Sequence, residues 1–180
     1  VIHRTNRKGF KAGALRDAQP SVTGDFIAIF DADFLPQPRF LRDLMPHFDD
    51  PRVAVVQGRW GHFNEGSSFL TRAQAMAIDG HFSVEQGARN WSGLWMNFNG
   101  TAGIWRREAI DDAGGWTDDT LTEDLDLSFR AQFRGWKLRF VPDVEAPAEI
   151  PATVSAFRSQ QRRWAKGSSQ TFRKHAARLI

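Results

Sequence analysis

The sequence predicts an α/β protein with a mainly parallel sheet flanked by helices, and two observations carry the prediction. Uninterrupted apolar runs occur at residues 26–30 and 53–56, and the second run extends to Gln57 as a predicted buried strand. Such runs, without polar alternation, are typical of strands buried on both faces, as in parallel sheets. Each run is followed by a helical pattern, at 39–48 and at 67–88. Alternation of strands and helices is the signature of the α/β class.

The remaining elements continue this alternation. We expect short strands at 1–4, 102–106 and 137–141, and helices at 10–18, 107–113, 120–133 and 153–173. Residues 143–151 are rich in Pro, Glu and Ala and predict a loop. Within 67–88, apolar side chains recur at helical spacing and predict one buried face, made by Phe69, Ala73, Met76, Ala77 and Phe82.

Composition limits the possible functions. The 180 residues are 41% hydrophobic and 25% charged, which fits one globular domain. The net charge of +3 is compatible with phosphates or a membrane surface and does not require nucleic acid. The chain has no Cys, which excludes disulfides and thiolate metal sites, and no apolar run of about 20 residues. Because it opens on Val1 without Met, we expect a fragment of a longer protein.

Two aspartates, Asp31 and Asp33, follow the first apolar run directly. In open α/β sheets, ligands bind at the carboxyl ends of the strands. Two charges at the end of a buried strand are costly unless something positive meets them, such as Mg²⁺ bridging to a phosphate. The alternative is a turn in which both side chains cap backbone amides.

Cationic and aromatic side chains recur at two helices. Lys11 lies in the first turn of the first helix, where it could meet a phosphate or remain solvated. Gln160, Arg163 and Trp164 share one face of the last helix, a set that suits a diphosphate beside a sugar ring. The alternative is an amphipathic surface helix. Residues 172–180 mix cations with apolar side chains and could lie on an anionic membrane.

A cluster of acidic residues opens the helix that begins near residue 120. Thr120 and Glu123 have the spacing of a capping box, which is the simple structural explanation. A cap needs one acid, however, and this turn also holds Asp124 and Asp126. A surplus carboxylate is a candidate general base.

An aromatic cluster interrupts the regular pattern at residues 90–101. Trp91, Trp95 and Phe98 lie there among glycines and small polar residues. They could be ordinary core, or an aromatic wall against a carbohydrate.

Six short motifs then follow one another in a fixed order. They are KAGAL (11–15), DAD (31–33), FNGT (98–101), GGW (114–116), TED (122–124) and Q-x-x-R-W (160–164). Together they resemble family 2 glycosyltransferases of the cellulose-synthase type. FNGTAGIWR, the stretch 78–86 and RSQQRRWAKG are most similar to cellulose-synthase-like glucomannan 4-beta-mannosyltransferases and their bacterial relatives.

The resemblance implies a GT-A-like fold. Residues 1–150 would be the C-terminal part of its catalytic domain, and 151–180 the Q-x-x-R-W helix with a membrane-interface segment. The nucleotide-binding strands that precede KAGAL in the family would lie outside the chain, so the isolated segment is expected to be inactive. The intact protein would be an integral membrane protein with this domain on the cytoplasmic face.

The resemblance also implies roles for single residues. Asp31 and Asp33 would hold Mg²⁺ or Mn²⁺ on the donor diphosphate, and Lys11 and Arg163 would neutralise its charge. Asp124, with Glu123 beside it, would be the catalytic base. The acceptor end would be formed by Phe98, Asn99, Gly100, Thr101, Gln160 and Trp164.

The implied reaction is an inverting, metal-dependent transfer of mannose or glucose, from GDP-mannose or UDP-glucose, to a growing beta-glycan. Two other functions are open. One is phosphoryl transfer of the haloacid-dehalogenase type, which also places D-x-D after a buried strand but leaves TED and Q-x-x-R-W unexplained. The other is a non-catalytic basic module for nucleic acid or polysaccharide. The scattered basic residues disfavour it, and we expect no nucleic-acid partner.

Overall fold

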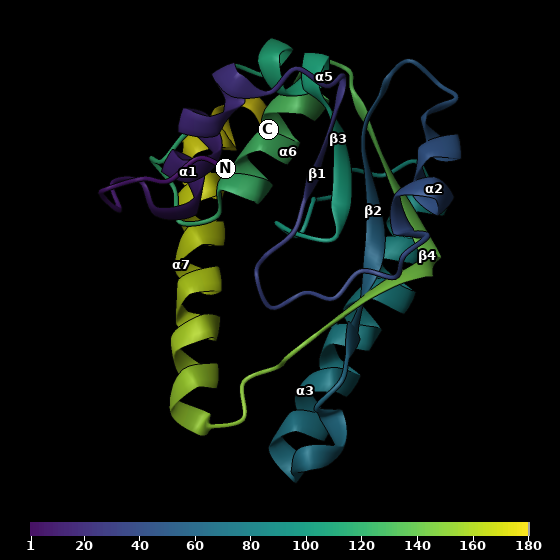
Figure 1. Cartoon of the computed structure of the whole chain (residues 1–180), viewed down its shortest axis with the longest axis vertical. Helices are drawn as coiled ribbons and strands as arrows, with labels where there is room; N and C mark the ends of the chain where they lie inside the picture. Colours follow the sequence, from purple (N-terminus) through teal and green to yellow (C-terminus); the bar gives the residue numbers. More distant parts are fainter. Residues whose placement is uncertain (180) are drawn as a thin grey trace.

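A computed structural model describes residues 1–179, and its centre is a four-stranded sheet (Figure 1). The strand order is β1-β3-β2-β4, with bounds β1 Phe26–Ile29, β2 Val53–His62, β3 Gly103–Arg106 and β4 Lys137–Ala148. β3 is antiparallel to β1 and to β2, whereas β2 and β4 are parallel. The α/β class is therefore confirmed: β1, β2 and β4 run in one direction, as expected for a mainly parallel sheet, and the reversed β3 makes the sheet mixed.

The reversed strand β3 positions the site. Its first residue, Gly103, pairs with Ile29 at the end of β1 and with Gln57 in β2. Because β3 is antiparallel, the segment that enters it arrives at the edge where β1 ends. FNGT is thereby placed beside the residues that follow β1. A run of apolar residues does not encode strand direction, so the sequence alone could not show this.

Two strand predictions need correction. β1 is an edge strand in the part of the chain that the structure describes, and only Ile29 of its four residues is buried. Residues 1–4 form no strand. Conversely, β4 continues to Ala148 and takes up most of the loop predicted at 143–151.

Helices cover both faces of the sheet. Their bounds are α1 Phe10–Ala18, α2 Phe40–Leu44, α3 Phe69–Gly80, α4 Gly87–Trp91, α5 Arg107–Asp112, α6 Glu123–Phe133 and α7 Val154–Leu179. Short 3-10 turns lie at η1 Gln19–Ser21, η2 Met45–Phe48 and η3 Glu65–Ser67, and a π-helix, η4, spans His81–Gln86. Figure 1 shows α2 on one side of the sheet and α6 on the other.

The core has one large apolar cluster on each face of the sheet. Under α5 and α6, the fully buried Trp105 packs edge-to-face against Phe98 and Trp116. Under α2, Phe40 and Leu44 pack against Val56. Burying an apolar side chain of this size stabilises the fold by about 1.5–3 kcal/mol, so these clusters hold the sheet rigidly.

The buried face of α3 differs from the predicted one. Phe69 and Met76 are 87% and 73% exposed, whereas Thr71, Gln74 and Ala75 are buried. Polar anchors decide the orientation, because the Gln74 side-chain amide donates to the carbonyl of Pro151 at 2.9 Å. Phe82 is buried as expected, although it lies in the π-helix beyond α3.

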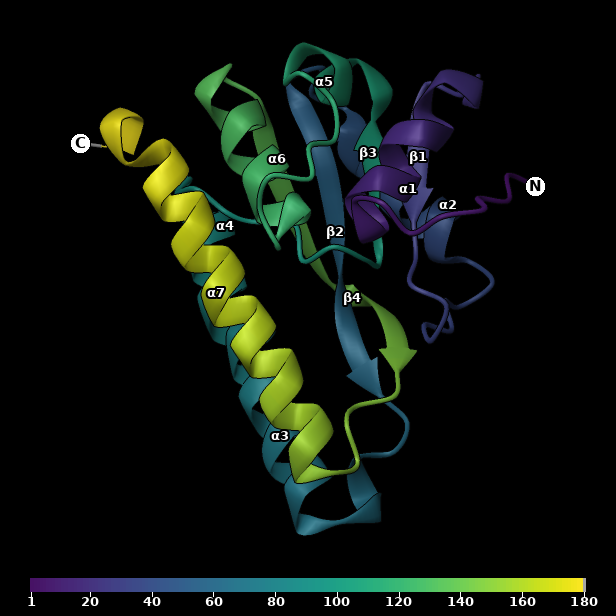
Figure 2. The ribbon, with the colours of Figure 1, turned by 90° about the vertical axis from the view of Figure 1, so that its left-hand side faces the viewer.

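Helix α7 lies to one side of the sheet. Both α7 and α3 extend beyond the sheet at the end where β2 stops (Figures 1 and 2). α7 is amphipathic, and Thr171 and His175 are buried. Within residues 1–179, no helix has the length and apolarity needed to span a membrane. Ile180, the last residue of the predicted membrane-surface segment, lies outside the described residues.

Candidate active site

The end of β1 already meets a positive charge. The Lys11 ammonium lies 2.5 Å from Asp31 Oδ1 and donates to the carbonyl of Gly100 at 2.7 Å. The backbone N–H of Asp31 donates to Thr101 Oγ1 at 2.9 Å. Asp33 has no ion-pair partner among residues 1–179. It lines a cavity that Lys11 and Asp31 also line. Lys11 thus compensates Asp31 and leaves Asp33 free for a cation.

Gly100 is needed in the FNGT loop for two reasons. Its φ of +86° is disfavoured for residues with a Cβ. An added Cβ would also lie 2.9 Å from Asp124 Oδ2 and 3.5 Å from the Lys11 ammonium. The missing side chain therefore lets the loop bring Lys11 and Asp124 close to one strand end.

The acidic cluster at the start of α6 is not a capping box. The N-cap is Thr122, whose side chain caps no backbone N–H, and the Leu125 N–H donates instead to Asp124 Oδ1 at 2.8 Å. Burial, followed by the neighbouring charge of Glu123, raises the pKa of Asp124 to about 7. Burial also raises the pKa of Glu123, although Lys11 and Arg163 oppose the shift. Asp124 therefore has the basicity of a general base near neutral pH.

Asp126, the third acid of the cluster, has a structural role. Its buried carboxylate accepts from Arg130 at 2.7 Å and lies 2.8 Å from His175 Nε2 and 2.9 Å from the Lys174 ammonium. Burial opposes ionisation, but these partners outweigh it and lower the pKa to about 2. Asp126 therefore ties α6 to α7.

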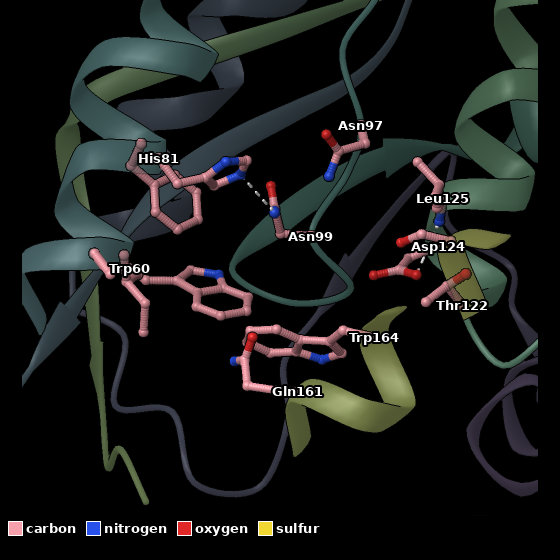
Figure 3. A pocket seen from close by; sticks show the side chains of 13 residues that line it. Trp60, His81, Asn97, Asn99, Thr122, Asp124, Leu125, Gln161 and Trp164 are labelled. Atoms are coloured by element: carbon pink, nitrogen blue, oxygen red, sulfur yellow. Dashed lines mark hydrogen bonds between the residues drawn. The ribbon is translucent and has the colours of Figure 1, made fainter. Parts of the chain in front are cut away.

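Two adjoining cavities meet at Asp124. The larger, of about 750 Å³, holds Lys11, Asp31, Asp33 and Glu123. Gln160, Arg163 and Trp164 also line it, which confirms that the three share a face of α7. The smaller cavity, of about 320 Å³, lies between α3, η4 and α7 (Figure 3). Trp60, Asn99, Asp124 and Trp164 belong to both.

Two predicted substrate contacts lie behind the cavity walls. Phe98 is fully buried in the core, and Thr101 is buried with its hydroxyl on the Asp31 backbone. Neither lines a cavity, so each can act on substrate only by fixing Asn99, Gly100 and Asp31. Trp91 and Trp95 line neither of these two cavities and are 75% and 41% exposed, so of the three aromatic residues only Phe98 is ordinary core.

Several lining residues were not expected from the sequence. Trp60 lies 6.4 Å from Trp164, measured between ring centroids, so the two indoles form the aromatic wall. Others include Arg7, Asp118 and Glu149 in the larger cavity and His81, Asn97 and Gln161 in the smaller one. Trp60 lies on β2 two residues beyond Gly58, and only the extension of that strand past Gln57 reveals its position.

The sequence matches the glycosyl transferase family group 2 over residues 26–180. The chain belongs to this family. The haloacid-dehalogenase alternative is therefore wrong, and a nucleophilic role for Asp31 does not suit a carboxylate paired with Lys11.

Relatives within the family are close. The chain is 48% identical over 183 aligned positions to a probable glucomannan 4-beta-mannosyltransferase 7 of Oryza sativa subsp. japonica, with 99% of this chain and 31% of that protein covered. It is 44% identical over 181 positions to glucomannan 4-beta-mannosyltransferase 7 of Arabidopsis thaliana, covering 98% and 33%. The chain thus spans about a third of these relatives.

Solved structures confirm the GT-A-type fold of this family 2 chain. A mannosyltransferase from Pyrobaculum calidifontis, solved with GDP-mannose and Mn²⁺, superposes with a TM-score of 0.74 at 23% identity, covering 98% of this chain and 46% of that one. A glucosyl-3-phosphoglycerate synthase from Mycobacterium tuberculosis, with Mn²⁺, UDP-glucose and phosphoglyceric acid, gives 0.55 at 18% identity, covering 95% and 57%.

Proposed function

We propose that the chain is the catalytic part of an inverting, metal-dependent glycosyltransferase. It transfers a hexosyl unit from a nucleotide sugar to the end of a beta-glycan. The observation that carries the proposal is the position of Asp124, a carboxyl with a pKa of about 7, where the two cavities meet. One cavity suits a diphosphate, and the other suits a sugar.

The larger cavity is the donor side of this proposal. Arg163 and Lys11 line it and would neutralise the diphosphate as it leaves, where negative charge develops. Six carboxylates line the same cavity against three permanent cations, the former being Asp31, Asp33, Asp118, Glu123, Asp124 and Glu149. Arg16 compensates Asp118 and Asp124 is only partly ionised near neutral pH, and a divalent cation that entered with the anionic diphosphate would neutralise the remaining excess.

The donor set fits Mg²⁺ or Mn²⁺. No group of three or more His, Cys, Asp or Glu within residues 1–179 could hold a metal alone. Asp33, with Asp31 beside it, offers the one or two carboxylates that such a cation uses together with substrate phosphates. The bound cation would supply charge neutralisation at the diphosphate.

Asp124 is the base of the proposed reaction. Its carboxylate takes the proton from the attacking hydroxyl, while the sugar C1–O bond to the diphosphate breaks on the opposite side. A single base and a direct attack invert the anomeric centre. Glu123 lies next to it in the larger cavity, where its negative charge raises the pKa of Asp124.

The smaller cavity is the acceptor side. Trp60 and Trp164 offer flat apolar surfaces, and Asn97, Asn99 and Gln161 offer amides, a combination suited to sugar rings and hydroxyls. The relatives named glucomannan 4-beta-mannosyltransferases favour mannose from GDP-mannose over glucose from UDP-glucose.

A donor and acceptor screen tests the function. The enzyme that contains this chain is incubated with GDP-mannose or UDP-glucose, with Mn²⁺ or Mg²⁺, and with beta-linked manno-oligosaccharides. We expect chain extension that stops when the cation is chelated. Hydrolysis of the donor without extension, for every acceptor, would contradict the proposal.

We also propose that the enzyme works at the cytoplasmic face of a membrane as part of an integral membrane protein. The exposed side of α7 supports this, because it carries cations together with Phe172, which is 57% exposed. Such a face suits an anionic bilayer surface. Flotation with vesicles containing anionic lipid, compared with neutral vesicles, tests it.

A further inference from the structure

The π-helix η4 places two side chains on the same loop residue. On an α-helix, which turns by about 100° per residue, His81 and Gln86 would point roughly 140° apart. The wider turn of a π-helix, with its i to i+5 hydrogen bonds, brings such positions onto one side. Gln86 Nε2 accordingly lies 2.7 Å from Asn99 Oδ1, and His81 Nε2 lies 3.1 Å from Asn99 Nδ2.

One backbone carbonyl fixes the direction of this network. Gln86 Nε2 also donates to the carbonyl of Asn97 at 2.8 Å, so the amide nitrogen of Gln86 must face this side. The Asn99 atom that it meets is then an acceptor oxygen, and Asn99 Nδ2 is turned toward His81. His81 Nε2 must accept, which leaves the ring proton on Nδ1.

Glu85 completes the chain of hydrogen bonds. Its carboxylate accepts from His81 Nδ1 at 2.8 Å and from Arg89 at 2.5 Å. Burial opposes its ionisation, but the hydrogen bond from His81 and the charge of Arg89 lower its pKa. The donors therefore run in one direction, from Gln86 to Asn99 to His81 to Glu85.

The network fixes the Asn99 amide in the wall of the smaller cavity. Figure 3 shows Asn99 with His81 on one side and Asp124 on the other, above the two tryptophans. Within residues 1–179, His81 is the one partner of Asn99 Nδ2, which leaves its second N–H for a ligand. The loop backbone is held as well, because the Asn99 N–H donates to the buried Gln57 side chain at 3.0 Å.

We propose that His81 is a positioning residue that holds the Asn99 amide as a hydrogen-bond donor to the acceptor sugar unit beside Asp124. The proposal rests on the proposed glycosyltransferase function. His81, Asn97 and Gln161 line the smaller cavity alone, whereas Lys11, Asp33 and Arg163 line the larger one alone. Asn99 itself lines both cavities, but His81, the partner of its amide nitrogen, lines only the smaller one, so the amide is assigned to the acceptor.

The test compares His81→Leu with His81→Gln in the enzyme that contains this chain. Leucine keeps bulk but cannot accept from Asn99, whereas the glutamine carbonyl can. We expect His81→Leu to raise the KM for a manno-oligosaccharide about tenfold, the scale of one hydrogen bond. The KM for the nucleotide sugar should stay within about twofold, and His81→Gln should recover most of the loss. His47→Leu, at a histidine that lines neither cavity, is the control.

A double-mutant cycle separates positioning from general damage. If His81 acts through Asn99, the variant His81→Leu with Asn99→Ala should be no worse than Asn99→Ala alone. Additive losses, equal losses in the leucine and glutamine variants, or an unchanged acceptor KM in His81→Leu would each overturn the proposal. A change confined to the donor KM would do so too.

Failure of the underlying function gives a different result. A wild-type enzyme that transfers no sugar to any acceptor would overturn the glycosyltransferase proposal. Calorimetry of oligosaccharide binding to the wild type and His81→Leu then still reports on His81. Equal affinities would reject its positioning role, and weaker binding by His81→Leu would support it.

Discussion

Asp124 and Asp126 lie two positions apart in α6, yet their environments move their pKa values in opposite directions. Asp124 has burial and the negative charge of Glu123 around it, which raise its pKa to about 7. Asp126 is surrounded by Lys174, Arg130 and His175, which lower its pKa to about 2. One carboxyl is thus suited to proton transfer, and the other is a fixed anion.

Asp124→Asn should abolish transfer without destabilising the protein. Loss of a positioned base typically costs about 10²–10⁴ in rate. Since the folded-state pKa lies above the ordinary value, the ionised form opposes folding as pH rises through 7, and the neutral amide avoids this. Transfer assays and urea unfolding at pH 8 test both points. Wild-type turnover, or marked destabilisation at pH 8, would contradict this role.

The wild-type transfer rate should depend on the ionisation of Asp124. Because the base must be deprotonated, kcat/KM is expected to rise with pH through about 7 and then to level off. Rate measurements from pH 5 to 9 at saturating cation check this. A flat profile below pH 7, with chemistry limiting, would remove Asp124 as the base.

At the scale of elements, the junction of α6 and α7 brings the substrate-binding residues of α7 to the base. Asp126 joins the two helices through Lys174 and His175. Two turns earlier in α7, Gly167 allows a close approach, because an added Cβ would lie 2.5 Å from Thr122 Cγ2. Trp164 and Arg163 lie one turn before this contact, so the junction sets their distance from Asp124.

Asp126→Asn should weaken this junction. Removing one partner of a buried charge cluster costs about 3 kcal/mol. Because the pKa of Asp126 is lowered, its contribution to stability is present above pH 4 and is lost as pH falls toward 2. Urea unfolding at pH 7 and at pH 3 should show a gap between variant and wild type that narrows in acid. A constant gap would contradict the ionic explanation.

Gly167→Ala should displace α7, with Gly66→Ala as the matched control. The new methyl group meets the Thr122 backbone and side chain, whereas a Cβ at Gly66 has nothing within 4 Å. Overpacking of this kind costs about 1–3 kcal/mol. We expect a lower Tm and a transfer rate reduced at least tenfold for Gly167→Ala only. Equal behaviour of the two variants would show that the close approach is not required.

At the scale of the whole molecule, the topology assembles the site from five distant segments. Lys11 follows the amino-terminal turn, Asp31 and Asp33 follow β1, and FNGT precedes the reversed strand β3. TED opens α6, and the Q-x-x-R-W motif lies in α7. Where these segments meet, the larger cavity has more carboxylates than cations. This excess of negative charge determines how the protein should respond to ligands.

Cation and nucleotide should stabilise the protein jointly. Mn²⁺ with GDP is expected to raise the Tm of the enzyme that contains this chain by more than the sum of the separate effects, since each ligand supplies charge that the other needs. Asp33→Ala should abolish the joint effect. Thermal unfolding with and without each ligand tests this. An undiminished joint shift in Asp33→Ala would exclude Asp33 as the metal-binding carboxylate.

The sequence by itself determined the chemistry that lies in short local patterns. Carboxylates directly after a strand, and Gln160, Arg163 and Trp164 at helical spacing, depend only on neighbours along the chain. The order of the motifs indicated the family, and the family match confirmed it. These features were predictable because local geometry fixes which residues of one element lie together.

Only the tertiary structure decided the rest. The direction of β3, the pairing of Lys11 with Asp31 and the structural role of Asp126 all depend on contacts between segments far apart in sequence. The aromatic wall of Trp60 and Trp164 and the hydrogen bond between His81 and Asn99 depend on such contacts as well. The physical reason is that pKa, charge compensation and cavity shape are set by what packs around a side chain, and a one-dimensional pattern does not contain those neighbours.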